Sequence, residues 1–277
     1  MITISPKELE VFAEFTHART GIVINSSKAY LLENRLAPLL DEAGAKSFFE
    51  FFQIVSHSPE WTTRIIDAIT TNETSFFRDQ RPFDLLHSTL LPEIINRRKA
   101  CRGSMPLTLN IWSAACSTGQ EVYSVAMILA EFLGKEAREW NIKITGSDIS
   151  TAVLSKASQG EYTPYEVDRG VPNHLRAKYF VPKGEMLVIR PELRAMTTFR
   201  KINLLAPAEN IGQFDLVFCR NVGIYFNQEN RCRLFTQIAG RLHAEGVLII
   251  GSTESLIGVC DCFIRHEAQN TAFFRKR

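Results

Sequence analysis

The chain has 277 residues, 45% of them hydrophobic and 22% charged, with a formal net charge of +2. This composition can bury a sizeable core in one or two domains, and the small net charge excludes a general attraction to nucleic acid or acidic membranes. No run approaches the ~20 continuous apolar residues of a transmembrane helix, and no basic segment leads into an apolar one at the N-terminus, so we expect a cytoplasmic protein.

Cysteines and histidines indicate neither a disulfide framework nor a metal site. The six cysteines form no CxxC pair, and the six histidines are dispersed without an HExxH motif. We therefore expect six reduced thiols and no metal. The chain also lacks a G-x-S-x-G elbow and a Walker loop.

The first part of the chain, from Ser5 to about Thr70, has a helical pattern. Apolar residues recur there with the 3.6-residue period of an amphipathic helix. Asn25-Ser26-Ser27 predicts an N-cap, Gly44 predicts a helix end, and Ser58-Pro59 predicts the start of another helix. We expect a small all-helical domain.

After Arg102–Pro106, short apolar runs alternate with helical stretches. This alternation indicates βαβ units and a mostly parallel sheet buried on both faces, which is the α/β class. Residues 162–193, rich in proline and glycine, predict a β-element inserted between the second and third core strands, and residues 262–276 predict an antiparallel hairpin at the sheet edge. The predicted core strands are Leu107–Trp112, Ile142–Ser147, Thr197–Ile202, Phe214–Cys219 and Gly246–Gly251.

The run Asn110–Ser124 carries the strongest chemical signal. A buried strand leads into small residues closed by Gly119 and then into the first turn of a helix, whose unpaired N–H groups can meet a ligand. The single loop glycine disfavours a dinucleotide with its pyrophosphate. It favours S-adenosylmethionine (SAM), which has a ribose and a cationic amino-acid tail but no phosphate. Glu121 in this first turn would face the tail; alternatively, it only complements the helix dipole.

Asp148 ends the second predicted strand. In nucleoside-binding βαβ units an acid at this position accepts hydrogen bonds from the ribose hydroxyls. Alternatively, Asp148 is the N-cap of the following helix.

Three further motifs place polar residues where a ligand can be bound. Thr71–Asp79 joins the helical part to the rest of the chain and is alternatively a linker with two core phenylalanines. Arg220-Asn221 follows the apolar run Leu216–Cys219, at the carboxyl end where open parallel sheets bind ligands, and is alternatively a polar strand end that meets water. Asn203-Leu204 follows another strand and is alternatively part of a turn.

Taken together, five motifs in order resemble the CheR family of chemotaxis protein methyltransferases, and the similarity runs from Gly21 to Leu256. The resemblance implies a class I SAM-dependent methyltransferase. Its N-terminal helical domain would be residues 1–75, and its methyltransferase domain, with a Rossmann-like, mostly parallel seven-stranded sheet, would be residues 76–277. An antiparallel β-subdomain would be inserted in the second domain at about residues 162–193. The motifs are Thr-Asn-Glu-Thr-Ser-Phe-Phe-Arg, Trp-Ser-Ala-Ala-Cys-Ser-Thr-Gly-Gln-Glu, Gly-Ser-Asp-Ile, Ile-Asn-Leu-Leu and Phe-Cys-Arg-Asn-Val-Gly-Ile-Tyr-Phe.

The resemblance also implies the reaction and the partner. Members transfer a methyl group from SAM to glutamate side chains of chemoreceptors, leaving S-adenosylhomocysteine. We therefore expect a monomer that acts on the cytoplasmic helical domain of membrane-bound receptors. Apart from the resemblance, Arg98 and Tyr225 are candidates to orient the substrate carboxylate; alternatively, they only contribute surface charge and core packing. The cofactor contacts implied by the resemblance are Asn72, Thr74, Arg78, Glu121, Asp148, Asn203, Leu204, Arg220 and Asn221.

The chain departs from the family pattern in two places. The inserted segment between Phe180 and Val188 is short, whereas members that dock on a tethering peptide at the receptor C-terminus tend to have a longer loop. We therefore expect no requirement for such a tether. The early helix keeps only Lys28 and Arg35 as basic residues, so recognition of an acidic receptor helix would depend on others, such as Arg97–Lys99.

Two other functional classes fit the sequence less well. A SAM-binding regulatory module without turnover is disfavoured by the intact polar set, and a dinucleotide oxidoreductase is disfavoured by the single loop glycine.

Overall fold

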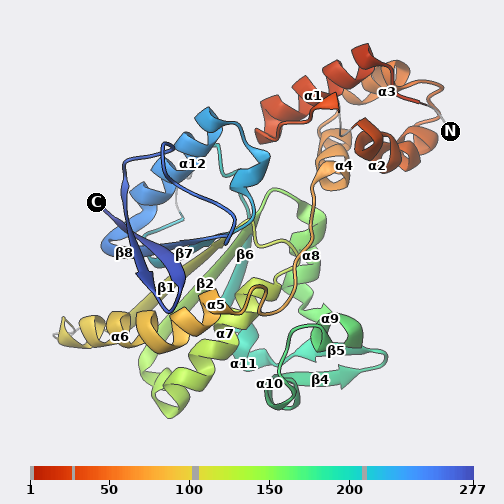
Figure 1. Ribbon diagram of the computed structural model, residues 1–277. Helices are drawn as coiled ribbons and strands as arrows, with labels where there is room; N and C mark the ends of the chain where they lie inside the picture. The colour runs from red at the N-terminus through yellow and green to blue at the C-terminus, as the bar shows by residue number, and fades with distance from the viewer. Residues whose placement is uncertain (1–2, 27–28, 102–105, 208–210) are drawn as a thin grey trace.

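The computed structural model describes residues 3–26, 29–101, 106–207 and 211–277 and shows two packed parts, a helical part and a larger α/β part (Figure 1). Of the sequence features used above, Ser27, Lys28 and residues 102–105 lie outside the described residues.

The N-terminal part consists of the four helices α1 (Pro6–Thr20), α2 (Ala29–Glu42), α3 (Phe48–Val55) and α4 (Pro59–Ile69). Ser58 caps α4 as predicted, with Pro59 in the first turn. Gly44 lies just after α2 with φ +68°, in the left-handed region that favours glycine. The helices share one apolar core, in which the ring of Phe12 stacks on that of Phe51 at 5.9 Å.

A seven-stranded sheet forms the centre of the larger part, in the order β6-β2-β1-β7-β8-β10-β9. The first five strands in this order are parallel, and β10 and β9 form an antiparallel hairpin at one edge. Both predictions are thus confirmed. The strands are β1 (Leu107–Ala114), β2 (Trp140–Asp148), β6 (Thr197–Lys201), β7 (Phe214–Cys219), β8 (Leu242–Ile250), β9 (Phe263–Ala268) and β10 (Thr271–Lys276).

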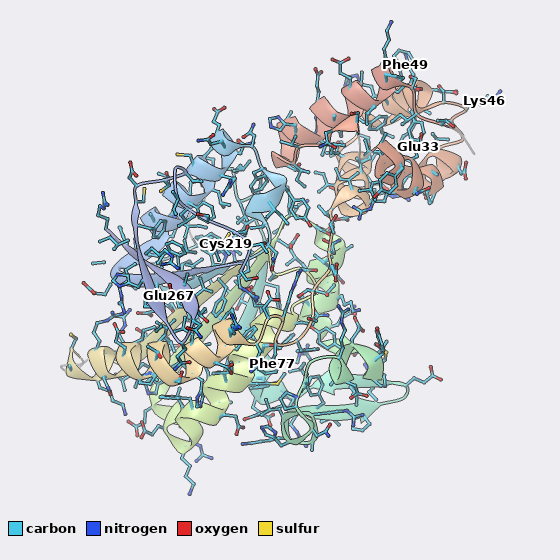
Figure 2. All side chains as sticks on the ribbon, viewed as in Figure 1. Glu33, Lys46, Phe49, Phe77, Cys219 and Glu267 are labelled. Atoms are coloured by element: carbon cyan, nitrogen blue, oxygen red, sulfur yellow. The ribbon has the colours of Figure 1, made fainter. Side chains whose placement is uncertain are left out.

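Helices cover both faces of this sheet, which is why its strands are apolar on both sides. On β7, Leu216 and Phe218 belong to the core under α5–α7, whereas Val217 and Cys219 belong to the core under α12. Figure 2 shows Cys219 inside the α/β part, while Phe49, 56% exposed, lies on the helical part. The helices are α5 (Arg81–Leu85), a π-helical turn (Leu86–Leu90), α6 (Leu91–Ala100), α7 (Gln120–Leu133), a 3₁₀ turn (Gly134–Glu139), α8 (Thr151–Gln159) and α12 (Gln228–Arg241).

The segment between β2 and β6 forms a small separate sheet, in the order β3-β5-β4. Its first strand brings Tyr162 into the interior, where the hydroxyl donates to the Thr118 carbonyl at 2.7 Å and the ring meets Phe76 edge-on at 4.9 Å. The insertion is therefore fixed to two loops of the main part. Its elements are β3 (Glu161–Tyr162), α9 (Pro164–Asp168), α10 (Asn173–Tyr179), β4 (Phe180–Lys183), β5 (Met186–Ile189) and α11 (Pro191–Arg194).

Candidate functional site

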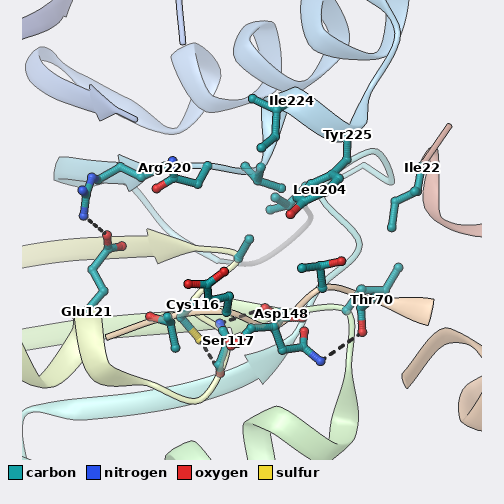
Figure 3. Close-up of a pocket in the computed structure, with 18 of the residues that line it drawn as sticks. Ile22, Thr70, Cys116, Ser117, Glu121, Asp148, Leu204, Arg220, Ile224 and Tyr225 are labelled. Atoms are coloured by element: carbon teal, nitrogen blue, oxygen red, sulfur yellow. Dashed lines mark hydrogen bonds and ion pairs between the residues drawn. The ribbon is translucent and has the colours of Figure 1, made fainter. Parts of the chain in front are cut away.

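A pocket lies at the carboxyl edge of the parallel strands, where the helical part and its linker meet the sheet (Figure 3). All nine residues that the sequence picked out as cofactor contacts line this one pocket, although they come from five separate segments of the chain. Parallel strands end at the same edge, and this explains why the motifs converge. Their contact with a cofactor stays a prediction.

The loop after β1 forms the floor of the pocket. It contains three residues with positive φ, Ala115 (+59°), Ser117 (+50°) and Gly119 (+91°). A Cβ atom on Gly119 would lie 2.9 Å from Cβ of Ala157 and 3.2 Å from the Tyr162 hydroxyl, so only glycine fits there. The single glycine of the loop is thus required for packing against α8.

Asp148 lies at the end of β2, only 7% exposed, and faces this floor (Figure 3). One carboxylate oxygen accepts a hydrogen bond from the Ser117 N–H at 2.9 Å and the other from the Ser150 N–H at 3.0 Å. The N-cap of α8 is Ser150, so the capping alternative for Asp148 is wrong. Burial raises the pKa of Asp148, opposed by these backbone hydrogen bonds. Each oxygen keeps a lone pair for a ligand hydroxyl.

Glu121 is part of a charge cluster around the buried Arg220 guanidinium that the sequence did not reveal. Its carboxylate accepts a hydrogen bond from the Ser113 hydroxyl at 2.7 Å and one from the Arg220 guanidinium at 3.0 Å. The same guanidinium also donates to Asp79 at 2.8 Å and to the Arg78 carbonyl at 2.9 Å. Two carboxylates and one guanidinium sum to −1, so the cluster still favours a cationic ligand group.

The linker before the pocket is held by a residue of the helical part. Arg35 donates to the carbonyls of Ile69 at 2.6 Å and Thr70 at 3.2 Å and to the Thr71 hydroxyl at 3.2 Å. These contacts fix the chain immediately before Asn72. Arg35 is therefore engaged within the protein, rather than presented to a receptor.

The segment that follows α1 forms part of the pocket wall next to Tyr225 and Phe226. Ile22 forms a β-bridge with Phe226, and the Val23 N–H donates to the Tyr225 carbonyl at 2.9 Å. Asn203 donates to the Arg19 carbonyl at 2.8 Å. The helical part therefore contributes directly to the walls.

Two alternatives from the sequence hold together with a place in the pocket: the core phenylalanines of Thr71–Asp79 and the turn at Asn203-Leu204. Phe76 and Phe77 are core residues, 1% and 7% exposed, between the pocket residues of the linker. The side chain of Asn203 accepts from the Leu205 N–H at 3.0 Å and so shapes a turn while it lines the pocket.

The prediction that Arg98 orients a substrate carboxylate is wrong. Arg98 pairs with Asp215, whose side chain is fully buried at the amino end of β7, opposite the edge that carries the pocket. Its neighbours are engaged there too, since Arg97 donates to the Glu245 carbonyl and Lys99 pairs with Glu136. The other candidate, Tyr225, does line the pocket.

The six cysteines are free thiols, as predicted. Cys116 lines the pocket, but burial and the nearby negative charges of Asp148 and Glu121 raise its pKa well above the ordinary value, so it stays protonated at neutral pH. Cys219 is buried and its pKa is likewise raised by burial, then by the charges of Glu254 and Glu121. Neither thiol is an activated nucleophile. In the described part of the chain, no group of three or more potential ligands could hold a metal ion, and no helix is long and apolar enough to cross a membrane.

Sequence reasoning missed the remaining lining residues, most of which are neighbours of those it found. The positive φ values of Ala115 and Ser117 depend on tertiary packing, and the residues after α1 reach the pocket only through docking of the helical part. The missed residues are Thr20, Ile22, Thr70, Thr71, Glu73, Ser75, Ala115, Cys116, Ser117, Ile149, Ile202, Val222, Ile224 and Phe226.

Comparison with known proteins assigns both parts of the chain. Residues 72–272 match the family model described as CheR methyltransferase, SAM binding domain, and residues 7–70 match that described as CheR methyltransferase, all-alpha domain. The chain is 38% identical over 260 residues to chemotaxis protein methyltransferase 1 of Pseudomonas aeruginosa and 36% identical over 259 residues to chemotaxis protein methyltransferase Cher2 of Pseudomonas putida, with 92% of each chain covered in both cases.

A more distant relative and a solved structure complete the comparison. The chain is 34% identical to the chemotaxis protein methyltransferase of Escherichia coli, covering 92% of this chain and 86% of that one. A TehB-like SAM-dependent methyltransferase from Corynebacterium glutamicum aligns with a TM-score of 0.38 at 14% identity, covering 72% of this chain and 96% of that chain, and adds nothing to the assignment.

Proposed function

We propose that this chain methylates glutamate side chains of chemoreceptors. It belongs to the CheR methyltransferase family and is thus a SAM-dependent chemotaxis protein methyltransferase. The observation that supports this best is the convergence of all nine residues picked out from the sequence on one pocket. The products would be glutamate methyl esters and S-adenosylhomocysteine.

The donor set of the pocket fits SAM. Asp148 offers two buried carboxylate oxygens to the ribose hydroxyls, and the cluster of Glu121, Arg220 and Asp79 offers a net negative charge to the cationic tail. Leu204, 8% exposed, adds an apolar surface for the adenine. When bound, SAM supplies an electrophilic methyl group on its sulfonium.

The acceptor carboxylate needs no general base, because an ordinary glutamate with a pKa of about 4.3 is already ionised at neutral pH. The pocket has to align it and to exclude water from it. We propose that Tyr225 orients this carboxylate, and that Arg78, whose guanidinium donates to the Glu73 carbonyl at 3.0 Å, attracts it. Ile224, 55% exposed, lines the same pocket and provides apolar surface against water.

We propose the following organisation and setting for the enzyme. Residues 1–75 form the helical domain and residues 76–277 the methyltransferase domain, with about 162–193 as the inserted subdomain. The chain acts as a cytoplasmic monomer recruited to membrane-bound receptors. Esterification removes one negative charge from a receptor helix, which is a local electrostatic switch for a two-state bundle.

We also propose that no receptor tether is needed. The hairpin of the inserted sheet is as short as hairpins become, since Lys183 pairs with Met186 and only Gly184 and Glu185 lie between. Receptors that carry a tethering peptide and receptors that lack it should therefore serve equally well.

The deciding experiment is transfer of a labelled methyl group from SAM to receptor-bearing membranes. Label that is released as methanol by mild base identifies a methyl ester. Receptors whose candidate glutamates are replaced by alanine are the control and should take up no label. If the wild-type enzyme binds S-adenosylhomocysteine but never labels a receptor, the protein is a cofactor-binding module instead.

A further inference from the structure

The segment Gly251–Leu256 belongs to the stretch that resembles the family, and its acid, Glu254, has a specific position. One carboxylate oxygen of Glu254 accepts the Asn221 N–H at 2.7 Å and the Gly251 N–H at 2.8 Å. Asn221 follows β7 and Gly251 follows β8, so a single oxygen ties the carboxyl ends of two neighbouring strands.

The surrounding backbone is shaped to hold this carboxylate. A Cβ atom on Gly251 would lie 2.7 Å from the oxygen that accepts both N–H groups, and one on Gly223 would lie 3.0 Å from the other oxygen. That second oxygen is buried without a hydrogen-bond partner among the described residues. The Glu254 N–H donates in turn to the Gly251 carbonyl at 3.0 Å, which closes a tight turn around the side chain. Two glycines and a turn thus leave room for the carboxylate between them.

The bonded residue, Asn221, begins one wall of the pocket. It has φ +59°, a left-handed conformation that asparagine adopts more readily than other non-glycine residues and that its surroundings select here. The wall continues through the turn Gly223–Tyr225, and Asn221 and Tyr225 line the pocket. Glu254 itself is not among the lining residues.

We infer that Glu254 is a positioning residue for methyl transfer: its carboxylate holds Asn221 in the left-handed conformation and so fixes the wall from which Tyr225 meets the acceptor. This inference rests on the proposed function. It assigns to Glu254 an effect on the alignment of the acceptor. The ribose and the cationic tail are assigned above to Asp148 and to the cluster of Glu121, so the effect on the acceptor adds to the predicted contact of Asn221 with the cofactor.

The test compares Glu254→Ala, Glu254→Gln and Glu254→Asp with wild type and with Thr253→Ala, an exposed neighbour in the same turn. Turnover of labelled SAM on receptor membranes gives kcat, and calorimetry with S-adenosylhomocysteine gives the cofactor affinity and the fraction of active protein. Because a misplacement of about 1 Å can cost about 100-fold in rate, we expect kcat of Glu254→Ala to fall about 10–100-fold. The Kd for S-adenosylhomocysteine should rise by a smaller factor than kcat falls, because Asn221 is only one of the nine predicted cofactor contacts.

Rescue by the conservative variant separates positioning from general stability. The amide oxygen of Glu254→Gln can accept both N–H groups, so this variant should recover most of kcat, whereas Glu254→Asp is one methylene too short to reach them and should not. This pair also decides the matter if Glu254→Ala does not fold. Wild-type kcat in Glu254→Asp, or equal losses in Glu254→Gln and Glu254→Asp, would overturn the inference. No transfer by wild type would instead contradict the proposed function.

Discussion

Replacing Glu121 by glutamine keeps the size of the side chain and removes its charge. The cluster of Glu121, Arg220 and Asp79 changes from a net charge of −1 to zero, because the guanidinium and one carboxylate remain. If this cluster binds the cationic tail of the cofactor, Glu121→Gln should weaken ligands that have the tail and spare ligands that lack it. Replacing Asp148 by asparagine should weaken both kinds, because both contain the ribose.

The size of the effect follows from the burial of the site. The Glu121 side chain is 13% exposed and that of Arg220 2%, so water screens their interactions little. A hydrogen bond to a charged group contributes about 1.5–3 kcal/mol. A tenfold change in Kd corresponds to about 1.4 kcal/mol, so we expect the Kd for S-adenosylhomocysteine to rise about 10–100-fold.

Titration calorimetry with two ligands makes the comparison. S-adenosylhomocysteine has adenine, ribose and the ammonium-bearing tail, whereas methylthioadenosine has adenine and ribose only. For Glu121→Gln the Kd for methylthioadenosine should stay within about threefold of wild type. Glu131→Gln is the matched control, since Glu131 lies on the same helix but bonds Lys178 and Tyr179 outside the pocket.

Two results would refute this reasoning. Equal weakening of both ligands by Glu121→Gln would mean that Glu121 acts only by holding Arg220 and the loop in place. No change for either ligand would mean that the cationic tail binds elsewhere, and that Glu121 merely complements the helix dipole.

Three further predictions follow from the structure. Arg98→Met leaves Asp215 buried without its ion-pair partner, which costs about 3 kcal/mol of folding free energy and should lower the Tm by about 6–12 °C in a thermal scan. The kcat measured 20 °C below the Tm should stay unchanged. A lost kcat would mean that Arg98 does belong to the site. We predict that the ribose hydroxyls donate to the ionised form of Asp148, so affinity for methylthioadenosine should fall as the pH drops through the raised pKa of Asp148, above the ordinary 3.8. A flat pH profile in calorimetry would argue against this contact. Deletion of the receptor C-terminal tail should leave the methylation rate unchanged, and a large loss in the labelling assay would contradict tether independence.

The sequence was sufficient to predict the fold class and the residues that line the candidate pocket from the strand ends. Apolar runs such as Leu216–Cys219 occur where a strand is covered on both faces, and polar residues that follow such runs lie at one edge when the strands are parallel. Asp148, Asn203 and Arg220 were found in this way, because Asp148 ends β2, Asn203 lies two residues after β6 and Arg220 directly follows β7. Their order along the chain and the parallel direction of the strands together determine their placement.

Pairings between distant segments could not be predicted. Arg220 meets Glu121 from 99 residues away and Asp79 from 141 residues away, and Arg98 meets Asp215 from 117 residues away. Such pairs depend on the register between strands and on how α5–α7 pack against the sheet. A strand-end arginine and a helical arginine look alike in the sequence, although one lines the pocket and the other lies at the opposite edge.

The charges around the pocket indicate how donor and acceptor are kept apart. Glu121 and Asp148 follow β1 and β2, and Arg220 is matched by two carboxylates, so this side repels a second carboxylate. The guanidinium of Arg78 is bonded to the Glu73 carbonyl, bears a positive charge and lines the same pocket as Tyr225. We propose that Arg78 and Tyr225 meet the receptor glutamate, whereas the ammonium of the cofactor tail binds beside Glu121. Opposite charge preferences of this kind would set the acceptor oxygen against the methyl group, as direct displacement requires.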